Sequence, residues 1–264
     1  MSEMITDPQL IAQAAKQFAE EPVVVVTTQA PSSNEVKLPG GFINREGALV
    51  KYAEVRELNG ADEETIARSG TTGRALATML QRGLVSLGMD STSKEDLDTL
   101  LSGDRDAILI GIRKATFGVD IEFDVRCQHC NAEQTSVVNL DADVPVKSLN
   151  DPIEDRKWVY ESGIGPVTLT LPTGAVQRRL LENSDKTPAE MNTILLAGCV
   201  GSINGSPSIG ASSVLRLSWK DRDKLVAEIL DRNPGPRLGE VKKDCEACGE
   251  SMDLPLTLAT LFRV

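Results

Sequence analysis

The sequence predicts an α+β protein made of two tandem, homologous α+β units that follow an N-terminal arm. Three observations lead to this prediction. Strand-like stretches alternate with amphipathic helical stretches along the 264 residues, a set of residues recurs at a nearly constant displacement, and two Cys-x-x-Cys pairs stand about one repeat length apart. We expect the arm over residues 1–39, the first unit over residues 40–150 and the second unit over residues 151–264.

The recurring residues define the repeat. Asp104-Arg105-Asp106 returns as Asp221-Arg222-Asp223. Apolar residues follow both motifs at the same spacing: Ile108, Leu109 and Ile112 in the first copy, and Leu225, Val226 and Ile229 in the second. Each half has strands, a Gly-Ala turn into a helix, two further helices, a strand, a cysteine pair and a final strand. We therefore expect the units to pack about a pseudo-two-fold axis; chance resemblance between amphipathic helices is the alternative.

The two Asp-Arg-Asp motifs are interpreted as helix starts. Two carboxylates beside an arginine could also suggest acid-base or phosphate chemistry. However, Ser102 and Ser218 stand where an N-cap would, and acidic residues in a first turn interact favourably with the helix dipole. The apolar residues after each motif then face a core at helical spacing.

Four of the five cysteines lie in two short motifs, here called knuckles, Cys127-Gln-His-Cys130 and Cys245-Glu-Ala-Cys248. Strand-like stretches flank each knuckle, at residues 119–126 and 134–140 for the first, so we expect each knuckle at the tip of a zinc-ribbon-like β-hairpin. Two thiolates on a tight turn can bind one ion, and a second such turn completes a tetrahedral zinc site. The sequence predicts one structural Zn²⁺ held by Cys127, Cys130, Cys245 and Cys248. Buried thiols or two local disulfides are the alternatives.

The remaining chemistry-bearing residues favour a protein that is not an enzyme. Cys199 lies in the apolar helical run Ile194–Val200 and is expected in the core, whereas His129, the only histidine, is expected to face solvent. With one histidine there is no serine or cysteine triad. The glycine-rich stretch 198–210 does not open a helix as a phosphate loop does, and its Asn204-Gly205 dipeptide predicts a hairpin turn.

The N-terminal residues lie outside the repeat. Residues 8–20 can form a short amphipathic helix, and a loop-like stretch up to Gly41 follows the strand-like run Val23–Thr28. This run is either an edge strand of the first unit or an arm that adds a strand to a neighbouring protein.

Composition argues against several classes of protein. The formal net charge of −11 counts against nucleic-acid binding, because neutralising phosphates requires a basic face. We expect no signal peptide and no membrane span, since residues 1–7 are polar and no apolar run is long enough. Cysteines kept for metal fit a reducing cytoplasm.

Several short motifs resemble a known family. Leu38–Phe42 and Val55–Glu64 resemble the opening of small baseplate hub and tail-assembly proteins of tailed bacteriophages. Asp221–Asp223, Asn233–Pro236 and Cys245–Val264 resemble the C-terminal portion of the same family. The resemblance covers residues 38–264, and it departs from the family in the first knuckle, which lacks the proline and glycine often found in such turns.

The resemblance implies a tail-tip or baseplate protein, located in the virion after assembly in the host cytoplasm. We expect a non-enzymatic, zinc-stapled connector between hub or tube proteins and the surrounding baseplate proteins, in multiple copies within a symmetric assembly. If the Val23–Thr28 run is an arm and not an edge strand, we expect it to contribute to these contacts, and we expect no nucleic-acid or membrane partner. One alternative is a tail assembly chaperone absent from the mature virion, and a second is a cytoplasmic zinc-ribbon protein of the RNA or transcription machinery.

Overall fold

The computed structural model describes residues 34–254 and 256–262. The helix expected over residues 8–20 and the Val23–Thr28 run lie outside the described residues. The chain is a mixed α and β protein with several small antiparallel sheets, which agrees with the predicted class. None of the helices in the described part is long and apolar enough to cross a membrane.

The first half begins with a four-stranded sheet in the order β1-β2-β3-β4. Its elements, in chain order, are β1 (Glu35–Ile43), β2 (Leu49–Val55), α2 (Gly60–Ala67), α3 (Thr72–Gly83), β3 (Leu84–Leu87), β4 (Asp90–Ser91), α4 (Lys94–Thr99), α5 (Ser102–Phe117), β5 (Asp120–Arg126) and β6 (Glu133–Asn139). Helix α5 packs against β1 and α3, and it contributes Ile108 and Ile112, both fully buried, to the first core.

The second half repeats this order of elements after two short connecting segments, β7 (Val146–Lys147) and the 3₁₀ turn η1 (Glu154–Arg156). It contains β8 (Lys157–Ser162), β9 (Gly165–Thr170), α6 (Gly174–Glu182), α7 (Pro188–Cys199), β10 (Val200–Ile203), β11 (Ser206–Pro207), α8 (Ala211–Val214) and α9 (Trp219–Arg232). The strands again form one sheet in chain order, β8-β9-β10-β11. Leu225 and Ile229 are fully buried in a second core together with Cys199, as expected.

The C-terminal segment returns to the first half. It contains β12 (Gly235–Pro236), the 3₁₀ turn η2 (Leu238–Glu240), β13 (Lys242–Asp244), β14 (Ser251–Asp253) and α10 (Leu258–Phe262). Strand β12 pairs with β7, and α10 packs against α5, where Arg113 Nε donates to the Leu261 carbonyl at 2.9 Å. A third core therefore joins distant parts of the chain, with Ile121 and Val138 from the β5–β6 hairpin beside Val241 and Leu256.

The packing between the halves departs from one expectation. Helix α6 of the second half lies against α3, α4 and α5, whereas its counterpart α2 packs mainly on α3 of its own half. A two-fold axis would require α2 to make the reciprocal contacts with α7, α8 and α9. The second half therefore contacts the first half through α6, but within the described residues the first half makes no comparable contact through α2. The pseudo-two-fold axis expected for whole units does not describe this packing.

Two expectations at element ends need correction. Strand β1 begins at Glu35, so residues 35–39 belong to the first sheet rather than to a loop or arm. The pairing register with β2 shifts between Lys37 and Phe42, and such an irregular stretch of an edge strand tolerates Pro39 and the glycines that suggested a loop. Ser218 does cap α9 by accepting from Asp221 N–H at 3.1 Å, but α5 has Leu101 at its N-cap without a side-chain cap.

The first Asp-Arg-Asp motif is instead buried where the two halves meet. Asp104 Oδ1 accepts from the Gly40 N–H at 2.7 Å, and Arg105 Nη1 donates to the Gly174 carbonyl at 2.8 Å. Burial is the largest cause that raises the pKa of Asp104 to about 7, against the opposing hydrogen bond from Gly40 and the charge of Arg156. The motif therefore links α5 by hydrogen bonds to β1 of the first half and to the start of α6 in the second half. Its role goes beyond that of a helix start.

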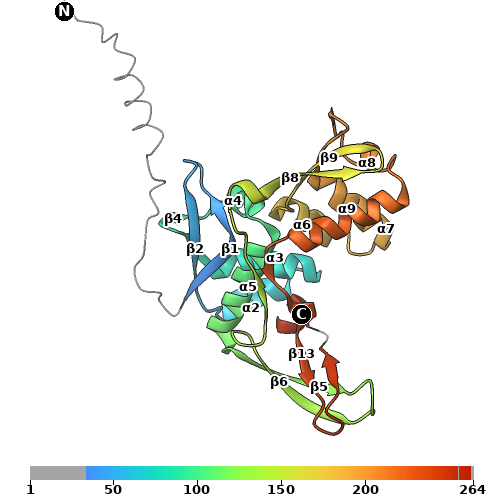
Figure 1. Cartoon of the computed structure of the whole chain (residues 1–264). Helices are drawn as coiled ribbons and strands as arrows, with labels where there is room; N and C mark the ends of the chain where they lie inside the picture. Colours follow the sequence, from blue (N-terminus) through green and yellow to red (C-terminus); the bar gives the residue numbers. More distant parts are fainter. Residues whose placement is uncertain (1–33, 255, 263–264) are drawn as a thin grey trace, which may run out of the picture.

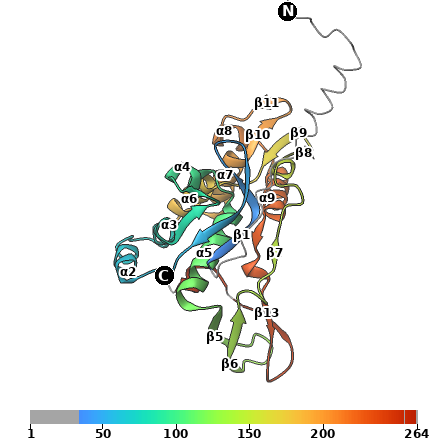
Figure 2. The ribbon, with the colours of Figure 1, turned by 90° about the vertical axis from the view of Figure 1, so that its left-hand side faces the viewer.

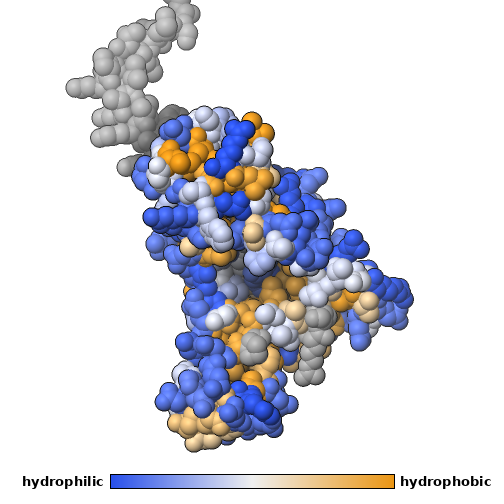
Figure 3. All heavy atoms as spheres, turned by 90° about the vertical axis from the view of Figure 1, so that its right-hand side faces the viewer, coloured by the Kyte–Doolittle hydropathy of each residue, from blue (hydrophilic) through white to orange (hydrophobic). Residues whose placement is uncertain are grey.

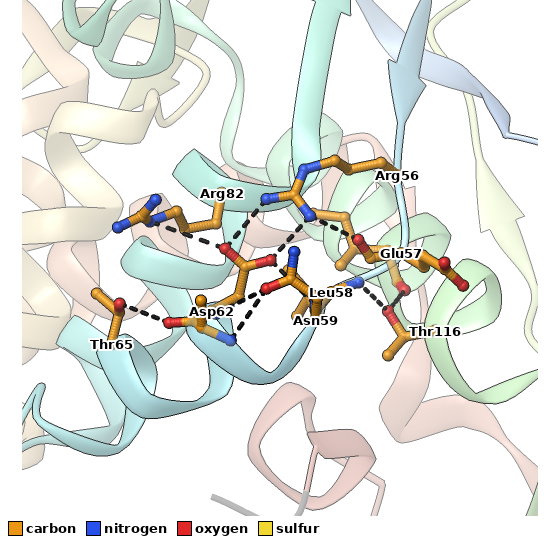
Figure 4. Close-up of polar contacts among 10 residues, drawn as sticks. Arg56, Glu57, Leu58, Asn59, Asp62, Thr65, Arg82 and Thr116 are labelled. Carbon is orange, nitrogen blue, oxygen red and sulfur yellow. Dashed lines mark hydrogen bonds and ion pairs between the residues drawn. The ribbon is translucent and has the colours of Figure 1, made fainter.

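The start of α2 depends on a second buried carboxylate, that of Asp62, which is 2% exposed. Arg56 donates to its two oxygens at 2.8 and 3.0 Å, and Arg82 Nε lies 3.9 Å from Oδ1 (Figure 4). Asn59 and Asp62 also form a capping box. The hydrogen bonds from Arg56, followed by that of the Asn59 backbone, hold the pKa of Asp62 below its usual value.

Candidate metal centre

The two knuckles lie at the tips of hairpins, as predicted. Strands β5 and β6 pair over seven residues, from Asp120 opposite Asn139 to Arg126 opposite Glu133. Strands β13 and β14 pair over only three. Both hairpins project from the same end of the molecule, away from the two four-stranded sheets (Figures 1 and 2).

The backbone of the two knuckles has the same hydrogen-bond pattern. The first cysteine of each donates its N–H to the carbonyl five residues later, at 2.8 Å for Cys127 and 2.9 Å for Cys245. Its own carbonyl accepts from the residue four positions later, Asn131 at 2.9 Å and Gly249 at 2.8 Å. These bonds close each turn so that both of its thiols can face the other hairpin.

The four sulfur atoms come together although the knuckles are far apart in sequence. The ligand atoms of Cys127, Cys130, Cys245 and Cys248 all lie within 4.8 Å of one another. The Sγ atoms of Cys127 and Cys248 are 3.8 Å apart, and those of Cys130 and Cys245 are 3.7 Å apart. Four sulfurs at about 2.3 Å from one tetrahedral zinc ion stand about 3.8 Å from each other. The two cross-hairpin distances therefore fit a four-thiolate zinc site.

The four thiols do not all ionise easily without a cation. Backbone N–H groups, first that of Cys130, lower the pKa of Cys127 to about 6. The backbone N–H of Glu250 favours the Cys248 thiolate, yet desolvation and the three neighbouring cysteines raise the pKa of Cys248 to about 12. One thiolate thus opposes the formation of another. A divalent ion that prefers sulfur ligands would remove this conflict.

The surroundings of the cluster add further contacts between the two hairpins. Cys127 and Cys245 are buried with Met252 in a small apolar cluster, whereas Cys130 and Cys248 are exposed. Gln134 Oε1 on β6 accepts from the Glu246 N–H in the second knuckle at 3.0 Å. The sequence did not indicate Gln134 as part of the site, because its partner is set by the tertiary fold.

The other two candidate residues lie where they were expected. All five cysteines are free thiols, and Cys199 is fully buried in the second core. His129 is exposed, and its backbone N–H donates to Cys127 Sγ at 3.3 Å. Burial raises the pKa of Cys199 to about 12, as for an inert core thiol.

Comparison with known proteins places the chain in a family. The family model described as T4 bacteriophage base plate protein matches residues 56–212. No curated protein and no solved structure matches the chain. The matched region begins just after β2 and ends in α8, so it covers the helices of the first half, the first knuckle and the sheet of the second half, but not β1, β2, α9 or the second knuckle. More than half of the chain is matched, and the chain therefore belongs to the T4 bacteriophage base plate protein family, which implies a structural, non-enzymatic role among the tail proteins of the virion.

Proposed function

We propose that the protein is a zinc-stapled connector that joins hub or tube proteins to the surrounding baseplate proteins. The observation that carries this proposal is the cluster of four sulfur atoms between two hairpin tips. One Zn²⁺ bound by Cys127, Cys130, Cys245 and Cys248 would fasten the C-terminal segment to the β5–β6 hairpin. Four thiolates leave no open coordination position for water or substrate, so the role of the ion is structural.

We also propose that the two halves arose from one duplicated unit. The order of elements supports this, since each half has a hairpin, two helices, a second hairpin, a short and a long helix, and a knuckle hairpin. The matched hydrogen bonds of the two knuckles support it as well. In this proposal the pseudo-two-fold relation applies to the knuckles and not to whole units.

The surface offers contacts for partners in a symmetric, multi-copy assembly. Apolar side chains are exposed near the start of α9 and around α8, among them Ile209, Leu215 and Trp219. Figure 3 shows apolar patches that interrupt the hydrophilic surface on this side of the molecule. Exposed apolar patches of this kind are typical of protein interfaces.

The proposed arm contact through Val23–Thr28 is tested by deleting residues 1–33. This deletion leaves β1 intact. Baseplate assembly that proceeds unchanged would show that the arm makes no required contact.

Metal analysis tests the zinc proposal. The purified protein is expected to contain about one zinc ion per chain, and Cys127→Ser is expected to lose most of the metal and to unfold at a lower temperature. Cys199→Ala is the matched control, because it removes a thiol outside the cluster and should keep the zinc. Protein without zinc, or equal zinc loss in both variants, would refute the proposal.

Mass spectrometry of intact virions distinguishes a connector from an assembly chaperone. A connector should be detected in the purified virion, and a chaperone should be absent from it.

A further inference from the structure

A polar cleft of about 460 Å³ lies between α2 and α3 of the first half and α6 of the second. None of its lining residues belongs to the knuckle hairpins. Four arginines line it, Arg68, Arg74, Arg105 and Arg178, together with several serine and threonine hydroxyl groups. Its volume falls in the range of about 300–1,000 Å³ that is usual for ligand sites.

Arg105 is the most informative residue of the cleft. The residue is 5% exposed. The charges of Asp106 and Asp98 attract its guanidinium. Nη1 donates to the Gly174 carbonyl, but the buried Nε has no hydrogen-bond partner. A buried charge is costly unless an opposite charge or further hydrogen bonds compensate it. The cleft therefore has a buried donor, Arg105 Nε, that lacks an acceptor.

Nearby acidic residues do not accept from Arg105 Nε, and each has another hydrogen-bond or ion-pair partner. The pairs are Glu64 with Arg68 at 3.0 Å, Asp98 with Arg178 at 2.7 Å and Asp106 with Gln177 at 2.6 Å. Glu182, which also lines the cleft, lies 4.0 Å from Arg178. The side chain of Arg74, by contrast, is exposed on the wall and makes no hydrogen bond or ion pair with any described residue.

We propose that this cleft binds a carboxylate of an acidic peptide segment from a neighbouring baseplate protein. The planar guanidinium groups of Arg74 and Arg105 offer the donor geometry that a carboxylate accepts. Ala77 and Leu181 also line the cleft, and they provide apolar contacts for the side chains that flank an acidic residue, which a free phosphate ion would not use. The site is separate from the zinc cluster, and its existence does not depend on the metal.

Binding of a fluorescein-labelled hexaglutamate peptide to the full chain, followed by fluorescence anisotropy at low salt, tests the proposal. Arg74→Ala is expected to weaken binding about tenfold, because one charge-assisted hydrogen bond is lost. The matched control is Arg179→Ala on α6, an exposed arginine outside the cleft, which should bind as the unmodified protein does. Hexaglutamine should not bind.

Two further measurements complete the test. Arg105→Gln, checked for folding by circular dichroism, is expected to weaken binding at least as much as Arg74→Ala, and inorganic phosphate at equal concentration is expected not to displace the peptide. Unchanged binding in Arg74→Ala, or an equal loss in Arg179→Ala, would overturn the proposal. Displacement by phosphate would show a small-anion site instead of a peptide site.

Discussion

Asn131 and Gly249 hold the same place in the two knuckles, each four residues after the first cysteine, with backbone φ angles of 61° and 74°. This left-handed conformation favours glycine, and asparagine is among the few other residues that adopt it readily. The first knuckle has no glycine at this place, yet Asn131 gives it the same turn. The two knuckles are therefore equivalent in geometry although their sequences differ.

Substitution of Gly249 by alanine tests this equivalence. A Cβ at Gly249 would meet no atom within 4 Å, so the cost of Gly249→Ala comes from the backbone conformation and should be about 1–2 kcal/mol of the free energy of unfolding. Asn131→Gly should be nearly neutral. Gly239→Ala is the control, since it also meets nothing within 4 Å and has no positive φ. Chemical denaturation of the zinc-loaded protein measures all three, and equal stability of Gly249→Ala and Gly239→Ala would contradict the argument.

The pH dependence of stability should show the buried carboxyl of Asp104. Its pKa in the folded protein is about 7, above the ordinary value of 3.8, so the folded state binds the proton more tightly than the unfolded state does. The free energy of unfolding should therefore rise as the pH falls from about 7 to about 4, by up to about 1.4 kcal/mol for each unit of pKa difference. The pKa of Asp62 is lowered, so its ionised carboxylate stabilises the folded state. This contribution should be lost only as the pH falls below about 4.

Asp104→Asn isolates this contribution. The variant carries no titrating group at this position, so its stability should change less than that of the unmodified protein between pH 8 and pH 5. Asp106→Asn is the comparison, because the pKa of Asp106 is raised to about 6, mainly by burial, and its contribution should appear at lower pH. Urea denaturation at four pH values measures the profiles. Parallel profiles for Asp104→Asn and the unmodified protein would refute the assignment.

The joint between the halves depends on a close approach at Gly103. A Cβ built there would stand 1.6 Å from the Pro234 carbonyl oxygen, so Gly103→Ala must displace α5 or the segment before β12. We expect a loss of more than about 3 kcal/mol of unfolding free energy. Gly60→Ala, also in the first turn of a helix but with nothing within 4 Å, should change stability by less than about 1 kcal/mol. Thermal unfolding of both variants measures the difference, and similar midpoints would contradict the close approach.

Local patterns in the sequence predicted most of the elements. The apolar spacing at Ile108 and Ile112 predicted a buried helix face, and Asn204-Gly205 predicted the β10–β11 turn, where both residues have positive φ. The convergence of the knuckles was predicted from their chemistry, because two Cys-x-x-Cys turns together complete one four-sulfur site.

Tertiary contacts explain what the sequence could not predict. Pro39 and its neighbouring glycines indicate a loop by propensity, but pairing with β2 makes them part of a strand. Arg105 has the same neighbours in sequence as Arg222, yet Arg105 is buried because α6 packs over it, whereas Arg222 lies near the surface and donates to Thr193 Oγ1 at 2.7 Å. An asymmetric contact between two similar units leaves no signal in a repeat pattern.

Removal of zinc should loosen the two knuckles unequally. The β13–β14 hairpin has three residue pairs and the β5–β6 hairpin has seven, so we expect β13–β14 to depend more on the proposed metal ion. After chelation, hydrogen exchange at the Gly249 amide, which donates to the Cys245 carbonyl, should speed up more than exchange at the Asn131 amide. Buried amides of α5 near Ile108 should keep their protection, because the first core does not involve the cluster. Equal acceleration at both knuckles would contradict the unequal dependence. Loss of protection in α5 would show that the ion supports the whole fold and not mainly the attachment of the C-terminal segment.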